Sequence, residues 1–289
     1  MKYGLTLPIT GVDGDIHRLV EYAQLAEGVG WDGVFLEDYI VYHAGTEYPV
    51  YDPWVALAGI AMRTERVYLG TTVTPLPRRR PWKIARECVT LDHLSRGRFI
   101  LGIGLGDGHD KSFVHFGEII DLKQRVEMVD ESLDILEGLW SGQPFSYSGK
   151  HYHVDEVMFL PKPVQTPRIP IWVGSAWPRK GTIRRAARSD GAAVYKVNED
   201  GTYGELTPED VRELKRAVEQ RRSVTRPFDV VIGGSTPGDD RERARAIVRS
   251  FVEVGLTWWM EFVDPSLGGA ALRRRIEQGP PRVEMDEKM

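Results

Sequence analysis

Cysteine and long apolar runs are what this sequence has least of. Its one cysteine, Cys88, cannot close a disulfide within the chain, which favours a reducing setting. No stretch reaches the ~18 uncharged apolar residues that a membrane-spanning helix needs. The first residues, MKYGLTLP, also lack the apolar segment and the small-residue cleavage site of a secretory signal. The sequence therefore predicts a cytoplasmic protein without a membrane partner.

An excess of positive charge is missing too. The 38 Lys and Arg residues are outnumbered by 42 Asp and Glu residues, which gives a formal net charge of −4. A nucleic acid would require a basic surface that replaces counterions, so no nucleic-acid partner is expected. The 42% of hydrophobic residues is nevertheless enough to bury a large core, which excludes disorder as the main state. We therefore expect a folded protein whose ligand is a small-molecule substrate.

Short β-rich apolar runs alternate with amphipathic stretches of helical period along most of the chain. Eight such pairs predict an α/β fold, a (β/α)8 TIM barrel that forms a single domain over residues 1–289. The strand-like runs are 2–7, 33–37, 66–73, 98–104, 169–174, 191–197, 228–233 and 257–263. The helix-like stretches are 16–29, 53–63, 81–94, 122–139, 179–188, 208–222, 240–254 and 269–278.

Two longer segments interrupt this repeat, 106–121 after strand four and 141–168 before strand five. Connections of this length are usually lids or binding loops. The second segment begins with alternating aromatic and histidine residues, which predicts a surface hairpin. An open doubly wound sheet would show the same alternation, but it usually has fewer strands and often a glycine fingerprint after the first. The first strand here is followed by Pro8-Ile9-Thr10-Gly11, which is no phosphate loop.

In such a barrel the reactive groups lie in the loops that leave the C-terminal ends of the strands. This rule selects one short segment at each of strands two to eight. The candidate segments are Glu37-Asp38-Tyr39, 71–74, 104–107, 174–177, Tyr195-Lys196, 233–235 and Glu261.

The segments at strands three, four and eight overlap longer motifs, and a further motif lies before strand four. The chain reads TVTPLP at 72–77, LDHLSRGRF at 91–99 and LGIGLGD at 101–107, and it ends its barrel pattern with TWWME at 257–261. In this order and over nearly the whole barrel, they resemble the signature of the bacterial-luciferase-like oxidoreductases, a superfamily that includes coenzyme-F420-dependent members. A lone glycine run would have been far less specific.

The resemblance implies a flavin or deazaflavin across the barrel mouth. Thr72-Val73 matches a place where the family often has a bulge or a non-proline cis peptide that supports the ring. Gly104, Gly106 and Asp107 match the loop beside the ring, with Asp107 as a candidate catalytic group.

Three further matches concern the cofactor phosphate and the protons. Gly174-Ser175-Ala176 matches a turn that holds the phosphate at a helix N-terminus, and Lys196 would pair with a phosphate or carboxylate if it faces inward. Asp38 matches the acid at the end of strand two and is expected beside the cofactor, with Tyr39 as a second candidate catalytic residue.

Two departures from the family pattern leave the cofactor open. The luciferase-type monooxygenases have an arginine on the FMN phosphate where this chain has Leu105, and the F420 dehydrogenases have a histidine where it has Tyr39. The first expectation is a monooxygenase that uses FMN, supplied reduced by a partner flavin reductase. The alternative is a coenzyme F420-dependent dehydrogenase or reductase in which Asp107 or Tyr39 carries the proton. In either case the cofactor does the hard chemistry and the barrel orients it.

Other classes of function were weighed against these. A metal-dependent barrel hydrolase could use His109, Asp110 and His115, or His151 and His153, but the latter pair has no third ligand at a strand end, and no metal is expected. A non-catalytic flavin-binding barrel is a further alternative. The resemblance also implies a homodimer through helices two and three, where Ile84, Ala85, Val89 and Leu94 form an apolar stripe that could equally face the barrel.

Overall fold

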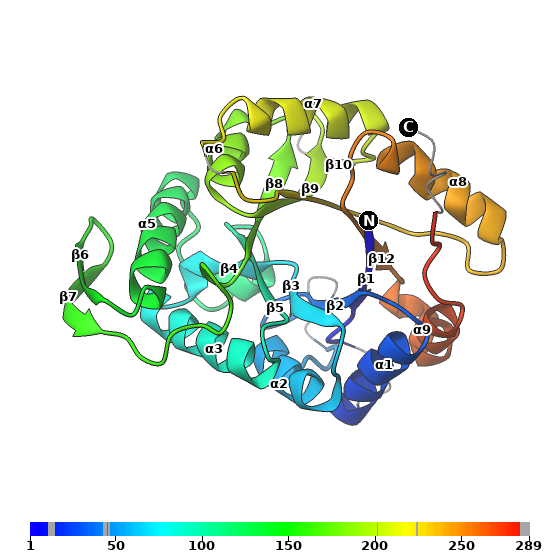
Figure 1. The fold of residues 1–289 in the computed structure, drawn as a ribbon, viewed down its shortest axis with the longest axis horizontal. Helices are drawn as coiled ribbons and strands as arrows, with labels where there is room; N and C mark the ends of the chain where they lie inside the picture. Colours follow the sequence, from blue (N-terminus) through cyan, green and yellow to red (C-terminus); the bar gives the residue numbers. More distant parts are fainter. Residues whose placement is uncertain (11–14, 43–44, 46, 201, 224, 284–289) are drawn as a thin grey trace.

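Parallel strands close into a barrel that is ringed by helices (Figure 1). The structure, a computed structural model, describes residues 1–10, 15–42, 45, 47–200, 202–223 and 225–283. Within these residues, eight parallel strands pair in the order β1–β2–β3–β5–β8–β9–β11–β12, and β12 pairs with β1 again, as predicted. The barrel strands are β1 (Lys2–Leu7), β2 (Gly33–Leu36), β3 (Tyr68–Thr71), β5 (Phe99–Gly104), β8 (Ile171–Trp177), β9 (Gly191–Val197), β11 (Asp229–Gly234) and β12 (Trp258–Phe262).

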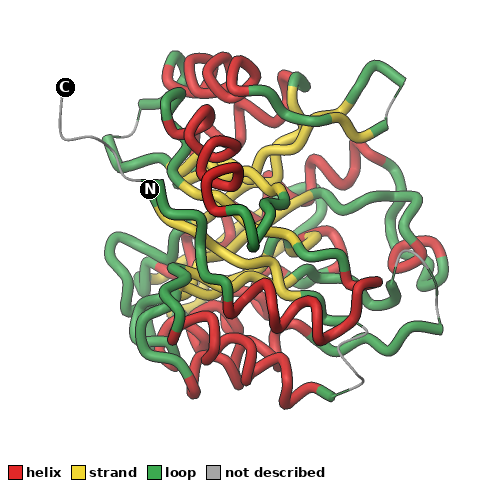
Figure 2. Tube along the Cα trace, turned by 90° about the vertical axis from the view of Figure 1, so that its right-hand side faces the viewer, coloured by secondary structure: helices red, strands yellow, loops and turns green. Residues whose placement is uncertain are grey.

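A helix follows each barrel strand and packs on the outside of the sheet (Figure 2). Helix starts follow the capping rules: Asp52 accepts from the backbone N–H of Trp54 and Val55 at 2.8 and 2.9 Å, and Pro53 fills the first helical position. The helices are α1 (Ile16–Gly28), α2 (Pro53–Arg63), α3 (Pro81–Leu94), α4 (Lys111–Val114), α5 (Leu122–Trp140), α6 (Lys180–Arg188), α7 (Pro208–Glu219), α8 (Arg241–Val252) and α9 (Gly268–Glu277).

Shorter elements decorate this frame. The predicted hairpin is confirmed: two antiparallel strands leave the barrel between α5 and β8 and are mostly exposed. A two-residue strand after β3 pairs with β5, and another pairs antiparallel with β9. These elements are β4 (Thr74–Pro75), η1 (Leu76–Arg78), β6 (Pro144–Ser148), β7 (His153–Met158), β10 (Tyr203–Gly204) and η2 (Pro265–Leu267).

Two of the predicted strand ends differ from the observed ones. The strand expected at 66–73 pairs only over Tyr68–Thr71, and the next two residues separate it from β4. The strand expected at 169–174 is β8, which begins two residues later and continues to Trp177. Tertiary pairing with β9 decides this end, because the ladder between the two strands runs on to the Trp177–Lys196 pair.

The barrel interior is plugged by large apolar side chains. Phe35 stacks on Trp172 with ring centroids 5.1 Å apart, and Trp172 meets Trp258 edge-on at 5.2 Å. A second and larger core lies between the strands and the helices. In the helix stripe, Ile84, Ala85 and Val89 are buried in this outer core and Leu94 packs against it partly buried, so the stripe faces the barrel.

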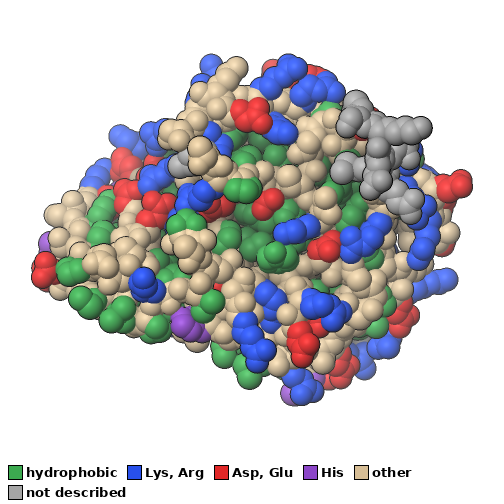
Figure 3. Space-filling model, viewed as in Figure 1, with side chains coloured by type: hydrophobic (Ala, Val, Ile, Leu, Met, Phe, Trp, Pro, Cys, Tyr) green, Lys and Arg blue, Asp and Glu red, His purple; other side chains and the backbone are tan. Residues whose placement is uncertain are grey.

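The outer surface carries charges of both signs. On the face drawn in Figure 3, Lys and Arg side chains lie interspersed with Asp and Glu side chains. Among the described helices, none is both long and apolar enough to cross a bilayer.

Glycine allows neighbouring strands to approach one another closely near the rim. A Cβ atom at Gly102 would lie 1.9 Å from the carbonyl oxygen of Thr71, and one at Gly70 would lie 2.0 Å from that of Ile100. Both contacts are with backbone, which cannot move without opening the barrel. A side chain at either position is therefore incompatible with the observed pairing of β3 and β5.

The substitution Gly102→Ala is expected to lower the free energy of unfolding by about 3 kcal/mol or more, because the new methyl group overlaps a backbone oxygen. Gly28→Ala is the matched control: Gly28 ends α1 and has no atom within 4 Å of the added methyl, so a gain of about 0.4–1 kcal/mol is expected. Urea denaturation followed by circular dichroism measures both. Equal effects of the two substitutions would contradict the close approach.

Candidate active site

The C-terminal ends of the strands form a rim of small and polar residues above the aromatic interior. Side chains two residues apart share one face of a strand, so Glu37 follows Phe35 and Gly174 follows Trp172 on the inner face. Phe35 and Trp172 are fully buried, whereas Glu37 and Gly174 are partly accessible and Gly233 is exposed. The inner surface thus changes from large side chains to small ones where a barrel enzyme binds its ligand.

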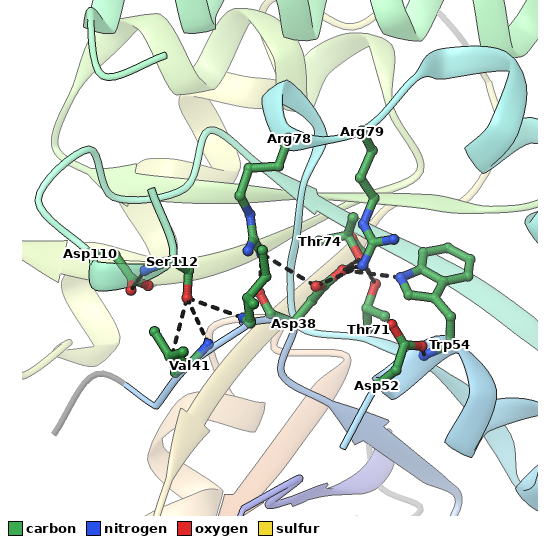
Figure 4. Close-up of polar contacts among 12 residues, drawn as sticks. Asp38, Val41, Asp52, Trp54, Thr71, Thr74, Arg78, Arg79, Asp110 and Ser112 are labelled. Atoms are coloured by element: carbon green, nitrogen blue, oxygen red, sulfur yellow. Dashed lines mark hydrogen bonds and ion pairs between the residues drawn. The ribbon is translucent and has the colours of Figure 1, made fainter. Parts of the chain in front are cut away.

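Asp38 is buried at the centre of a polar network that fixes the end of β2 (Figure 4). Arg79 donates to its two carboxylate oxygens at 2.9 and 2.7 Å, Trp54 Nε1 at 3.0 Å and Thr74 Oγ1 at 2.8 Å. Arg78 donates to the backbone carbonyl of Asp38 at 2.8 Å. Because protein donors occupy both carboxylate oxygens, Asp38 serves to position the strand end, which differs from the cofactor contact expected of it.

The loop after β5 is held from the side of α5. Arg125, which is buried, donates to the carbonyl oxygens of Leu105 and Gly106 at 3.1 and 2.6 Å. Gly106 has a φ of 69°, and a Cβ atom there would lie 2.4 Å from the ring of Phe113. Only glycine suits this position, and the loop therefore passes close over a buried aromatic ring.

Ser112 joins the loop after β2 to the loop after β5 (Figure 4). Its hydroxyl oxygen accepts from the backbone N–H of Ile40 at 3.1 Å and of Val41 at 3.3 Å, and it donates to the carbonyl of Val41 at 3.1 Å. Asp110 caps α4 by accepting from the N–H of Ser112 at 2.8 Å. We refer to this connection as the Ser112 bridge.

Thr72 and Val73 lie at the rim as expected, and the peptide bond between them is cis. The Thr72 hydroxyl oxygen is buried and has no hydrogen-bond partner among the described residues. The side chain of Val73 packs against Gly104 and Gly174. A Cβ atom at Gly104 would lie 2.7 Å from the Cγ2 atom of Val73, and one at Gly174 would lie 3.4 Å from it. Thr72, Val73, Gly104 and Gly174 are therefore brought together.

Gly174-Ser175-Ala176 form part of a strand and not the expected turn, and the phosphate contact expected of them stays a prediction. All three residues lie inside β8, opposite residues 193–195 of β9, whereas the pairing of β8 with β5 ends at Val173. Ser175 is buried on the outer face of the strand, where its hydroxyl donates to the carbonyl of Val173 at 3.1 Å. The turn that leads into α6 comes only after Trp177.

Lys196 does not face the rim either. Its ammonium group lies 2.8 Å from Asp210 at the start of α7, on the outside of the barrel, so the inward direction on which the expected cofactor contact depended is not observed. The preceding residue, Tyr195, takes the inward register and is 41% exposed. Burial raises the pKa of the Tyr195 phenol, and Asp107 raises that pKa further. The segment Tyr195-Lys196 was expected at the rim, and the structure places its first residue, which had been given no role, on the inner face.

Asp107 lies on the rim and is open to solvent. Its side chain is 57% exposed and accepts from the backbone N–H of His109 at 2.9 Å, with the His109 ring nitrogen 3.2 Å away. Arg125 holds the backbone immediately before it. Asp107 is therefore accessible to a ligand, as expected.

Tyr39 is almost fully buried and packs against Tyr42 with ring centroids 5.5 Å apart. Burial, assisted by the charge of Glu37, raises the pKa of the Tyr39 phenol far above its ordinary value. The phenol therefore keeps its proton at neutral pH. It can donate a hydrogen bond, but it cannot act as a base.

Glu37 is the second residue that sequence reasoning missed. The segment Glu37-Asp38-Tyr39 was expected at the rim, but its first residue was given no role. Among the described residues no side chain or backbone group forms a hydrogen bond or ion pair with the Glu37 carboxyl, and burial raises its pKa. The signal that could have found it is its spacing of two from the inward Phe35.

Two of the histidines considered as metal ligands, His151 and His153, lie beside carboxylates. His151 lies 2.8 Å from Glu127, and His153 lies 3.1 Å from Asp155. No group of three potential metal ligands occurs within the described part of the chain. The hydrolase alternative therefore has no metal centre among these residues.

The rim fits a flat tricyclic ring such as a flavin or a deazaflavin. Thr72 offers a buried hydroxyl that lacks a partner among the described residues, and Val73 offers an apolar surface. No side chain projects from the inner face at Gly104, Gly174 and Gly233. An unsatisfied buried hydroxyl is unfavourable unless a ligand completes its hydrogen bonding. These residues would border such a ring.

Comparison with known proteins gives a consistent result. The model of the luciferase-like monooxygenase family matches residues 1–281. An F420-dependent glucose-6-phosphate dehydrogenase of Nakamurella multipartita is 30% identical over 246 residues, which are 83% of this chain and 69% of that protein. Its counterpart from Microbacterium testaceum is 33% identical over 165 residues, and this alignment spans about half of the relative's length, 48%.

Solved structures share the fold at low sequence identity. The monooxygenase RslO1 of Streptomyces bottropensis aligns with a TM-score of 0.77 at 19% identity, over 96% of this chain and 97% of its own. An F420-dependent secondary alcohol dehydrogenase, in complex with an F420–acetone adduct, aligns with a TM-score of 0.76 at 16% identity, over 97% and 98%. Because the match to the family model runs through every barrel strand described above, this chain belongs to the luciferase-like monooxygenase family.

Proposed function

We propose that this protein is an F420-dependent oxidoreductase that moves a hydride between the deazaflavin and a small alcohol or carbonyl compound. The observation that carries the proposal is the rim itself, which combines the Thr72 hydroxyl, without a partner among the described residues, with glycines toward the C-terminal ends of β5, β8 and β11 and with the ionisable residue Glu37. The named relatives point to the deazaflavin: they are F420-dependent glucose-6-phosphate dehydrogenases.

This proposal replaces the first expectation, an FMN monooxygenase served by a flavin reductase. The relatives favour the F420 alternative, while FMN occurs only in distant structural neighbours. The loop after β5 agrees, because Leu105 offers no cation to an FMN phosphate. A partner reductase is not part of the proposal. The substrate class remains small organic molecules.

The chain's own residues would act in three ways. A bound deazaflavin supplies a carbon atom that accepts or gives a hydride. Thr72 would donate a hydrogen bond from its hydroxyl to the ring system, and the Val73 side chain would pack against one face of that ring system. The Asp38 network and the Ser112 bridge hold the loops after β2 and β5 in place, so that substrate is oriented without moving the scaffold. Tyr39 and Tyr195 would offer protonated hydroxyl groups.

The purified protein is expected to bind F420 with a dissociation constant of about 1 μM or lower, and FMN at least about tenfold more weakly. Titration of each cofactor, followed by its fluorescence, measures both constants. Tighter binding of FMN than of F420 would restore the monooxygenase interpretation. Binding of neither would reject the proposal.

Two adjacent threonines offer a matched pair of variants. Thr72→Val removes the unpartnered hydroxyl, so it is expected to weaken F420 binding by about two- to tenfold while leaving stability equal or higher. Thr71→Val removes a buried hydroxyl that donates to the Gly102 carbonyl at 2.8 Å, so it is expected to lower the free energy of unfolding by about 1 kcal/mol without weakening binding.

Fluorescence titration and urea denaturation of both variants check this pair. A Thr72→Val protein that binds F420 as the wild type does would remove Thr72 from the cofactor site. A stability loss in Thr72→Val as large as that in Thr71→Val would mean that the Thr72 hydroxyl has a partner within the protein.

A further inference from the structure

Two neighbouring carboxyl groups at the end of β2 differ in their direction and in their hydrogen bonding. Asp38 points outward and receives hydrogen bonds from Arg79, Trp54 and Thr74. Glu37 takes the inward register, and within the described residues its carboxyl receives no hydrogen bond and no ion pair. The unpartnered carboxyl is therefore the one that faces the rim.

An unpaired carboxylate in such a place costs stability. Burial disfavours its charged form, and no described cation or donor compensates for the loss of water. A glutamine or an apolar residue would satisfy the fold better. Destabilising ionisable groups of this kind concentrate where a protein needs them for binding or catalysis.

The other ionisable groups near the rim are less suited to taking up a proton. Tyr39 and Tyr195 keep their protons at neutral pH, because burial raises the pKa of both phenols. Asp38 already accepts from four side chains, counting the longer 3.3 Å contact from Arg78. Asp107 is open to bulk water.

We propose that Glu37 carries the substrate proton during hydride transfer, a role that rests on the proposed function. An alcohol that gives up a hydride from its carbon must also lose the proton of its hydroxyl group, so that the C=O bond can form. The Glu37 carboxylate would take this proton and become neutral, the electron pair of the O–H bond would form the C=O bond, and the hydride would carry the electron pair of the C–H bond to the deazaflavin. In the reverse direction the neutral carboxyl returns the proton to the carbonyl oxygen.

The surroundings of Glu37 suit this exchange. Among the described residues, the ionisable groups that interact with it are Tyr39 and Tyr42, which lie on the same loop after β2, and both phenols have their pKa raised by burial first and by Glu37 second. Burial moves the pKa of the Glu37 carboxyl upward, toward neutral pH. A group that changes protonation near the working pH transfers protons most effectively.

The first test separates proton transfer from binding. The probes are propan-2-ol and glucose 6-phosphate as hydride donors, with F420 reduction followed by absorbance. Glu37→Gln is expected to lower kcat by about 10²- to 10⁴-fold and to remove the acidic limb of the pH profile, while F420 affinity changes little. Glu37→Asp should retain part of the rate. The control Glu213→Gln, on the exposed face of α7, should behave as the wild type.

The variant Asp107→Asn tests whether Asp107, and not Glu37, carries the proton. If Asp107→Asn abolishes the acidic limb and Glu37→Gln keeps it, the proposal is overturned. Retention of the wild-type kcat and pH profile by Glu37→Gln overturns it as well. If the wild type binds no F420 or reduces it with neither donor, it is the proposed function that fails, and the next test then decides about Glu37 without turnover.

The second test needs no substrate. Protein labelled with carbon-13 at the glutamate carboxyl is titrated by NMR, and the Glu37 signal is assigned by its loss in Glu37→Gln. We expect this signal to titrate above the ordinary glutamate range of about 4.3, and to move further upward when F420 covers the rim and excludes water. An ordinary titration, or one that F420 leaves unchanged, would place Glu37 outside the site.

Stability against pH gives an independent readout. A raised carboxyl pKa in the folded state contributes stability that is fully present below the unfolded-state pKa and is lost as the pH rises through the folded-state pKa. Glutamine cannot ionise, so the melting temperature of Glu37→Gln minus that of the wild type should be larger at about pH 8 than at about pH 4. A difference that is constant or falls with pH would contradict the burial of a free carboxyl.

Discussion

The ion pair between the buried Asp38 and the partly buried Arg79 fixes the end of β2, and the arrangement of the rim depends on it. With Asp38 held outward by Arg79, Trp54 and Thr74, strand alternation leaves the neighbouring Glu37 no direction except inward. The hydrogen bonds of Asp38 thereby also fix the direction of Glu37, whose carboxyl has no partner among the described residues. Arg78 and Arg79 both contact Asp38, which has a positioning role, whereas no cation among the described residues contacts Glu37.

The barrel could be predicted from the sequence because eight pairs of strand and helix patterns differ clearly in period. The direction of individual side chains could not. β8 and β9 are apolar on both faces, since one face meets the interior aromatic plug and the other meets the helices, so their sequences show no alternation. For this reason the expected site included Ser175 and left the direction of Lys196 open, although both face outward, and gave no role to Tyr195, which faces inward.

The choice of cofactor was limited in a different way. Leu105 argues against an FMN phosphate site, whereas Tyr39 argues against the usual histidine of an F420 dehydrogenase, and the two departures oppose each other. The structure explains how both can hold in one protein. Tyr39 is buried and stays protonated, and the carboxyl two residues before it lies at the rim. On the proposed function, the departure at Tyr39 concerns which residue carries a proton, and F420 stays compatible with it.

The Ser112 bridge has a consequence for how specificity can change. A single hydroxyl ties the segment after β2 to the short helix after β5, although these segments come from strands that are not neighbours in the barrel. The two walls therefore form one mechanical unit, and an insertion or substitution in either is transmitted to the other. Evolution of a new substrate preference in this barrel would require coordinated changes on both sides, or loss of the serine that couples them.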